Sequence, residues 1–156
     1  MKFFPILGLM CLSIFVDAQV QSFADSPCQP QEDLVLLASV INSEASGESY
    51  DEKLRVGNVV LNRVYSKYYP NTLQDVIYQK KQFSGICGRL FRFDPCGDRG
   101  DKESIEAARA LLCGKRVLEP SIIGFFNEER STNKRFVARI KSKVVFTSEA
   151  HSYFRG

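Results

Sequence analysis

The feature that most constrains the fold is the stretch from Asp51 to Tyr65, whose apolar residues form two stripes along one predicted helix. Apolar positions three to four residues apart fall on the same face of an α-helix. One stripe holds Leu54, Leu61 and Tyr65, and the other holds Val56, Val60 and Val64. A helix that is apolar on two sides must be covered by other elements on both, so the sequence predicts a central, largely buried helix.

Further helices are expected around it. The first should run from Asp33, as N-cap, to Gly47, and a short one should begin at the capping-box pattern that follows Thr72. Another should extend from Asp101 to Cys113 and end at Gly114. Between these last two, residues 80–100 show no period and contain several glycines, which predicts a long loop.

The C-terminal part is rich in β-branched and aromatic residues. This favours short strands at Ile122–Phe126, Arg135–Ile140 and Val144–Thr147, the last two forming a hairpin around Lys141 to Lys143. The sequence therefore predicts an α+β fold that is dominated by helices and has a small C-terminal β region.

The first eighteen residues indicate a secretory signal peptide. Lys2 precedes an apolar stretch, and Val16-Asp17-Ala18 provides a small-residue cleavage site. The apolar stretch is too short to span a bilayer comfortably, so we expect no stable membrane insertion after cleavage. Residues 19–32, rich in Gln, Ser and Pro, are expected to be a flexible tether to a single domain at residues 33–156. The predicted location is secreted, periplasmic or in the cell envelope.

Four cysteines remain after removal of such a signal: Cys28, Cys87, Cys96 and Cys113. An even number in an exported chain favours two disulfides. Three connectivities are possible, and proximity favours a Cys87–Cys96 pair with Cys28 bound to Cys113. No Cys-x-x-Cys pair is present and there is one His, so we expect no metal site and no cofactor. The formal net charge is +3 without any block of like charges, which is not a nucleic-acid-binding pattern.

Glu44 is the candidate catalytic residue. It lies at the end of the first predicted helix, and at 100° per residue it projects between Leu37 and Val40. Apolar neighbours raise the pKa of a carboxyl group, and the negative end of the helix dipole acts in the same direction. An acid that keeps its proton near neutral pH can cleave a glycosidic bond. The alternative is a solvated Glu in a fraying last turn.

Several segments, in order, resemble the cell-wall hydrolase family of the spore cortex-lytic enzymes (SleB-like). The resemblance begins with Leu37-Ala38, Glu44-Ala45-Ser46-Gly47-Glu48 and Val56 to Val64. It continues with Tyr69 to Thr72, Val76 to Gln79, Gln82-Phe83-Ser84, Ala107 to Arg109, Phe125-Phe126-Asn127 and His151-Ser152-Tyr153-Phe154. It covers almost everything after residue 33.

The resemblance implies a lysozyme-like, lytic-transglycosylase-like domain that acts on peptidoglycan glycan strands, with Glu44 as the catalytic acid. It further implies that Gln82, Phe83 and Ser84 form a wall of the cleft and that Phe126 and Asn127 contact the sugar. The alternative for Phe126 and Asn127 is an ordinary strand followed by a turn-forming Asn. Tyr78 either hydrogen-bonds a sugar hydroxyl or buries its ring. Glu48, Asn62 and His151 are candidates for a supporting role behind the acid; the alternatives are helix capping for Glu48 and a purely structural role for Asn62 and His151.

A second catalytic carboxylate is not evident. Glycosidases usually need two, and Glu48, Asp51, Asp94 and Asp98 are the candidates. A single acid fits a lytic transglycosylase, in which the sugar's own 6-hydroxyl attacks and a 1,6-anhydro product forms. A lysozyme-type hydrolase and a non-catalytic cell-wall-binding module remain alternatives. We expect a monomer whose partner is the glycan strand of peptidoglycan.

Overall fold

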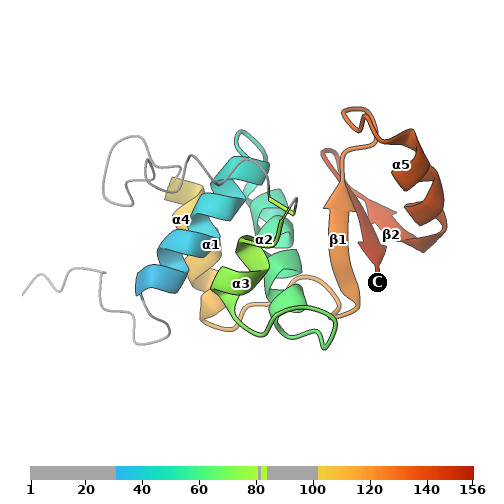
Figure 1. The fold of residues 1–156 in the computed structure, drawn as a ribbon. Coiled ribbons are helices and arrows are strands. Elements are labelled where there is room, and N and C mark those ends of the chain that lie inside the picture. Colours follow the sequence, from blue (N-terminus) through green and yellow to red (C-terminus); the bar gives the residue numbers. More distant parts are fainter. Residues whose placement is uncertain (1–30, 81, 84–101) are drawn as a thin grey trace, which may run out of the picture.

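The computed structural model describes residues 31–80, 82–83 and 102–156. Figure 1 shows helices α1 to α4 packed together on one side and a small sheet with helix α5 on the other. The helices are α1 (Gln31–Glu44), α2 (Tyr50–Val64), α3 (Leu73–Ile77), α4 (Lys102–Leu112) and α5 (Lys134–Ile140), followed by a 3-10 turn, η2 (Lys141–Lys143). The strands are β1 (Ile122–Phe126), β2 (Val144–Thr147) and β3 (Ser152–Arg155). The predicted α+β class, with more helix than strand, is confirmed.

Helix α2 is the central element, as its two apolar stripes predict. It packs against α1, α3 and α4 and, on another side, against β1. Ser49 is its N-cap, with the Ser49 hydroxyl accepting a 3.4 Å hydrogen bond from the amide of Glu52. Gly57 permits the close approach of the neighbouring helices, because a Cβ at this position would lie 2.5 Å from Leu111 Cδ1 and 2.7 Å from Ile41 Cδ1.

The neighbouring helices differ from the prediction only at their ends. Helix α1 begins at Gln31, so Asp33 lies in its first turn and is not its N-cap. Thr72 caps α3 as predicted, accepting a 3.1 Å hydrogen bond from the amide of Asp75. After α4 the chain turns at Gly114, which adopts φ 103° and ends the helix as predicted.

The sheet has three antiparallel strands in the order β1-β3-β2. The predicted strand at Arg135–Ile140 is wrong, because these residues form α5. Asn133 caps this helix by accepting a 3.0 Å hydrogen bond from the amide of Phe136, and Val137 and Ile140 place their side chains on one buried face. The predicted hairpin around Lys141 to Lys143 is therefore wrong as well, and β2 pairs instead with β3, a strand that we did not predict.

Three apolar clusters connect these layers. The largest joins α1, α2, α3 and α4, and Phe83 belongs to it. A second joins Val59 of α2 to Ile122 and Tyr153 of the sheet, and the third lies between the sheet and α5. The sheet is thus attached to the helices through α2.

No helix in the described ranges combines the length and the apolar character that crossing a membrane requires. The predicted signal peptide, most of the tether, most of the 80–100 loop and Cys28, Cys87 and Cys96 lie outside the described residues. Cys113 is exposed just after α4.

Candidate active site

Glu44 is the last residue of α1, and the chain turns away at Gly47, where φ is 81°. The Glu44 side chain is partly buried, and its carboxyl group accepts no hydrogen bond from any residue in the described part of the chain. Burial raises the pKa of Glu44, while the charges of His151 and Arg63 lower it. The rise expected from the sequence is confirmed, and its cause is burial. A partly buried acid beside a guanidinium and an imidazole suits proton donation.

Arg63 connects Glu44 to the segment that follows α3. This buried side chain donates from Nε to the carbonyl oxygen of Ile123 at 2.7 Å and from Nη1 to Gln82 Oε1 at 3.1 Å. Its guanidinium also lies 5.1 Å from the ring centroid of Phe83 and 5.5 Å from that of Tyr69. One cation therefore holds β1 and the predicted cleft residues Gln82 and Phe83 in fixed positions beside the acid.

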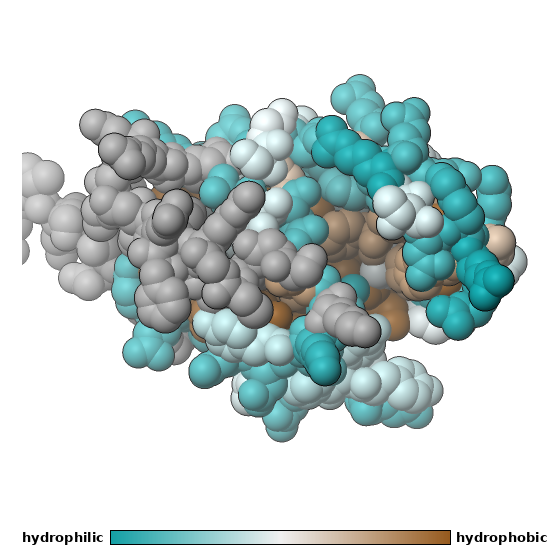
Figure 2. Space-filling model, turned by 45° about the horizontal axis from the view of Figure 1, so that its top comes forward, coloured by the Kyte–Doolittle hydropathy of each residue, from teal (hydrophilic) through white to brown (hydrophobic). Residues whose placement is uncertain are grey.

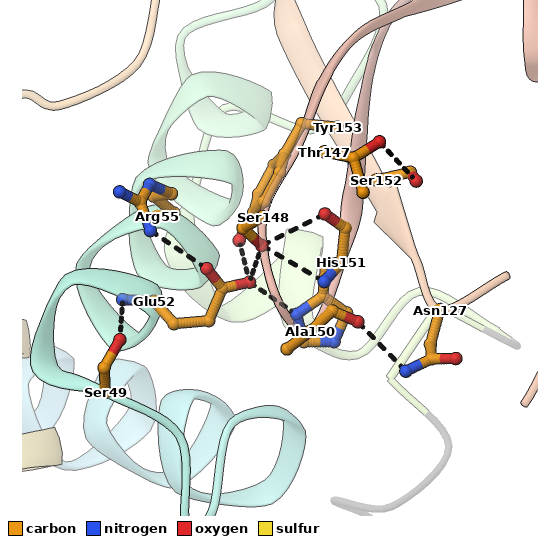
Figure 3. Close-up of polar contacts among 10 residues, drawn as sticks. All are labelled: Ser49, Glu52, Arg55, Asn127, Thr147, Ser148, Ala150, His151, Ser152 and Tyr153. Carbon is orange, nitrogen blue, oxygen red and sulfur yellow. Dashed lines mark hydrogen bonds and ion pairs between the residues drawn. The ribbon is translucent and has the colours of Figure 1, made fainter. Parts of the chain in front are cut away.

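A second group of polar residues surrounds the carboxylate of Glu52, in the first turn of α2 (Figure 3). Its Oε1 atom accepts hydrogen bonds from His151 Nδ1 at 2.7 Å, Tyr153 Oη at 2.7 Å and Ser148 Oγ at 2.9 Å. Its Oε2 atom accepts one from Arg55 Nη1 at 3.1 Å. Burial acts to raise the pKa of Glu52, but these donors outweigh it and hold the pKa at about 2. Glu52 is therefore ionised at neutral pH.

Glu52 is not available as a second catalytic carboxylate. Its side chain is only 4% exposed. Its Oε1 atom accepts three hydrogen bonds and its Oε2 atom accepts one, all from protein donors, so the carboxylate is engaged in holding these side chains. Any contribution of Glu52 to the reaction must therefore be made through the residues to which it is hydrogen-bonded.

The predicted cleft residues occupy different places. Gln82 is exposed and Phe83 is buried, and both are held by Arg63 near Glu44, whereas Ser84 lies outside the described residues. Tyr78 is 48% exposed and lines a groove of about 350 Å³ with Val35 and Leu36, beside the first half of α1. Glu44 lies at the other end of that helix.

Phe126 and Asn127 stabilise the sheet and the turn that follows β1. The Phe126 ring is buried against Phe136 and Phe154. The Asn127 side chain donates to the carbonyl oxygen of Ala150 at 3.0 Å and accepts from the amide of Arg130 at 2.8 Å, which closes the turn after β1. Contacts of these two residues with a sugar stay a prediction.

Asn62 is a buried anchor for the segment that leads into β1. Its Nδ2 donates to the carbonyl oxygens of Glu119 and Ile122 at 2.8 and 2.9 Å, and its Oδ1 accepts from Asn58 Nδ2 at 3.0 Å. The Asn58 Oδ1 atom in turn accepts from the amides of Val117 and Leu118 at 2.7 and 3.0 Å. Both Asn side chains are thus hydrogen-bonded inside the protein, which fits the structural role considered for Asn62.

Glu48 lines a cavity of about 360 Å³ on the outer side of Glu52, together with Asp51, Arg55 and Glu149. Its charge also helps to raise the pKa of Tyr153, although burial and Glu52 do more. A supporting role for Glu48 behind the acid stays a prediction.

The sequence reasoning missed Glu52 and gave Arg63 no role. One signal could have found Glu52: counting back in fours from Val60 and Val56 along the buried stripe leads to position 52. A carboxylate on a buried stripe needs donors. Three of the four donors to Glu52, however, are 96 to 101 positions away in the sequence, and spacing alone does not reveal them.

The described part of the chain brings together no group of three or more His, Cys, Asp or Glu side chains that could hold a metal ion.

Comparison with known proteins agrees with the fold. The family model described as Cell Wall Hydrolase matches residues 47–154. The spore cortex-lytic enzyme of Oceanobacillus iheyensis is 30% identical over 105 residues, which cover 66% of this chain and 35% of that protein. The corresponding enzyme of Bacillus subtilis strain 168 is 35% identical over 101 residues, or 65% of this chain and 31% of that protein. The match thus spans about a third of the length of these relatives.

Among solved structures, the catalytic domain of the germination-specific lytic transglycosylase SleB from Bacillus anthracis superposes with a TM-score of 0.69 at 22% identity. The alignment covers 81% of this chain and 97% of that one. At this identity the similarity supports the fold, and the predicted fold type is confirmed.

Proposed function

The chain belongs to the Cell Wall Hydrolase family, and from that membership we propose that it cleaves the glycosidic bond between N-acetylmuramic acid and N-acetylglucosamine in peptidoglycan as a lytic transglycosylase. The observation that carries the proposal is the Glu44 carboxyl group. It is partly buried, its pKa is raised, and within the described residues it has no hydrogen-bonding partner of its own. Such a group is free to meet the glycosidic oxygen.

One carboxyl group is sufficient for this reaction. Glu44 donates its proton to the glycosidic oxygen, and the bond to the anomeric carbon breaks. The 6-hydroxyl of the muramic acid then attacks that carbon and returns its proton to Glu44. The products are a new non-reducing end and a 1,6-anhydro-muramic end, and no water is consumed.

The isolation of Glu52 supports this mechanism over hydrolysis. A hydrolase would need a second carboxylate that reaches the sugar or a water. Glu52, whose pKa is lowered to about 2, is enclosed by four protein donors. Of the four carboxylates considered for that role, Glu48 and Asp51 line the cavity on the outer side of Glu52, and Asp94 and Asp98 lie outside the described residues.

The substrate would lie against side chains that Arg63 holds in place. Gln82 offers an amide to sugar hydroxyl or acetamido groups, and the neighbouring Phe83 contributes apolar contact. Figure 2 shows a hollow near the middle of one face, where apolar side chains lie between hydrophilic ones. Sugars present apolar ring faces and polar edges, so such a surface suits a glycan strand. Contacts from Tyr78, Ser84, Phe126 and Asn127 complete the proposed binding set, with Glu48, Asn62 and His151 behind it.

The proposal also includes export. Residues 1–18 would direct the chain out of the cytoplasm, residues 19–32 would be a flexible tether, and residues 33–156 would act as a monomer in the cell envelope or outside the cell. Two disulfides would form among Cys28, Cys87, Cys96 and Cys113. N-terminal sequencing of the exported protein should give a start near Gln19, whereas a start at Met1 would contradict a cleaved signal.

Mass spectrometry of peptidoglycan fragments tests the reaction. Purified peptidoglycan is incubated with the protein, and the released muropeptides are compared with those made by a muramidase that hydrolyses the same bond. We expect each fragment to be lighter by one water, as a 1,6-anhydro end requires. Fragments with reducing muramic ends would indicate a hydrolase, and binding without release of fragments would indicate a non-catalytic wall-binding protein.

A further inference from the structure

The Glu52 carboxylate determines which nitrogen of His151 carries a proton. An ionised carboxylate only accepts hydrogen bonds. Because Glu52 is ionised at neutral pH, the 2.7 Å contact with His151 Nδ1 must be donated by the imidazole. Nδ1 therefore carries a proton in either charge state of the ring, and Nε2 is the atom that gains or loses one.

His151 is also held in one orientation. Its ring meets Phe125 edge-on, with 4.9 Å between centroids and 73° between planes. Its backbone amide donates to Ser148 Oγ at 3.1 Å, and its carbonyl oxygen accepts from the Ser148 amide at 2.8 Å. Figure 3 shows Glu52, Ser148 and Tyr153 grouped around this residue. The side chain is 10% exposed, and its Nε2 has no hydrogen-bonding partner in the described part of the chain.

The same ring interacts electrostatically with Glu44. The charged groups that act on Glu44 are His151, from the loop before β3, and Arg63, from α2. The titratable groups around His151 are Glu44, Glu52 and Tyr153, whose ring centroid is 6.3 Å from that of His151. Glu52 itself is not among the groups that act on Glu44. The 2.7 Å hydrogen bond to His151 is the route by which Glu52 can influence the acid.

We propose that Glu52 is a positioning residue for the acid Glu44: it fixes the tautomer and orientation of His151, so that the imidazolium stabilises the carboxylate that forms when Glu44 gives up its proton. The inference rests on the proposed function, in which Glu44 is that acid. Burial raises the pKa of Glu44, and an acid that binds its proton more tightly is a weaker donor. A fixed cation beside it counteracts this by favouring the ionised product of proton transfer. Glu52 does not touch the substrate, because its own side chain is enclosed.

Carbon-13 NMR titration of the Glu44 carboxyl group tests the inference without relying on activity. It is recorded for the wild-type protein, Glu52→Gln, His151→Gln and the double variant. Glu128→Gln is the matched control, since it makes the same chemical change in an exposed ion pair with Lys141, at 3.1 Å, away from His151.

We expect the Glu44 pKa to move to higher pH in His151→Gln, because a group that lowers it is removed. Glu52→Gln should move it in the same direction. The double variant should show the same pKa as His151→Gln alone, since Glu52 acts through His151. In peptidoglycan cleavage the alkaline limb of the kcat profile should move likewise, with KM nearly unchanged. Glu128→Gln should change none of these.

An unchanged Glu44 pKa in folded His151→Gln would overturn the inference, and this variant decides the matter if Glu52→Gln does not fold. A shift caused by Glu52→Gln that persists in the His151→Gln background would overturn it too, because it would bypass the imidazole. If the wild-type protein cleaves no peptidoglycan, the proposed function fails, while the titration still reports whether Glu52 and His151 control Glu44.

Discussion

At the scale of single residues, Glu44 and Glu52 show how differently two carboxyl groups in one molecule can behave. Glu44 is partly buried without hydrogen-bond donors in the described part of the chain, and its pKa is raised. Glu52 is almost completely buried with four donors, and its pKa is lowered to about 2. Burial alone does not decide the charge of a carboxyl group, since the hydrogen bonds that it receives can outweigh desolvation.

The substitution Glu44→Gln should reduce peptidoglycan cleavage by at least about 10²–10⁴-fold, because Gln cannot donate the proton. A raised pKa in the folded state means that ionisation of Glu44 opposes folding as the pH rises through that pKa. Removing the charge should therefore not lower stability at neutral pH. Rates of muropeptide release and urea unfolding measure the two effects.

Glu128→Gln provides the comparison, because it removes a carboxylate from an exposed ion pair and should keep the wild-type rate. Cleavage by Glu44→Gln within a few-fold of the wild-type rate would reject Glu44 as the acid.

Acid should destabilise the protein partly through Glu52. Its pKa falls from an ordinary 4.5 to about 2 on folding, so the stabilisation is complete above about pH 4.5 and is lost as the pH falls toward 2. At 1.36 kcal/mol per pKa unit this is about 3 kcal/mol. In urea titrations at pH 7, 5 and 3, Glu52→Gln should be less stable at pH 7 and lose less stability on acidification than the wild type. Parallel curves for the two proteins would contradict the assignment.

The sequence predicted the raised pKa of Glu44 from its place near Leu37 and Val40 on one helix, and burial does raise it; the catalytic role of Glu44 stays a prediction. Glu52 was not predicted as a site residue because three of its four donors come from the loop before β3 and from β3 itself, about a hundred positions away. The first turn of a helix is also where a solvated Glu is common, since the helix dipole favours it there.

At the scale of elements, helices were easier to predict than strands. The 3.6-residue period of α2 and the caps of α2 and α3 depend on residues that are close to one another in the sequence. The segment Lys134–Ile140 contains Phe, Val and Ile, which favour strands, but the Asn133 cap and the burial of Val137 and Ile140 one turn apart favour a helix. Strand β3 is four residues long, and its pairing with both neighbours depends on tertiary contacts.

The pairing of β1 with β3 should be sensitive to one glycine. Gly124 lies opposite Phe154, and a Cβ at this position would lie 2.0 Å from Phe154 Cζ in a ring that cannot bend. Gly124→Ala should therefore displace the ring and destabilise the protein by about 1–3 kcal/mol in urea unfolding. Val145→Ala, at an exposed position of β2, should change stability by less than about 0.5 kcal/mol. Equal stabilities of the two variants would show that the sheet tolerates the added methyl group.

At the scale of the whole molecule, the helices and the sheet are joined through α2. Disulfides would add covalent links to this packing. Three of the four cysteines expected in the exported chain lie outside the described residues. Two disulfides should form on export, each stabilising by about 2–4 kcal/mol, in large part by restricting the unfolded chain. Alkylation of the unreduced exported protein followed by mass analysis should find no free thiols among Cys28, Cys87, Cys96 and Cys113. Four alkylated cysteines would contradict the prediction.

The hydrogen bonds to Glu52 from Ser148, His151 and Tyr153 have a consequence for folding kinetics. They close loops of 96 to 101 positions, whereas the contacts within α1, α2 and α4 are local. Contacts between distant positions form slowly, because chain entropy is lost before they stabilise anything. We therefore expect the helices to form first and the imidazole to arrive beside Glu44 late. A newly made chain would then acquire its full catalytic power only at the end of folding, after the most extended loop has closed.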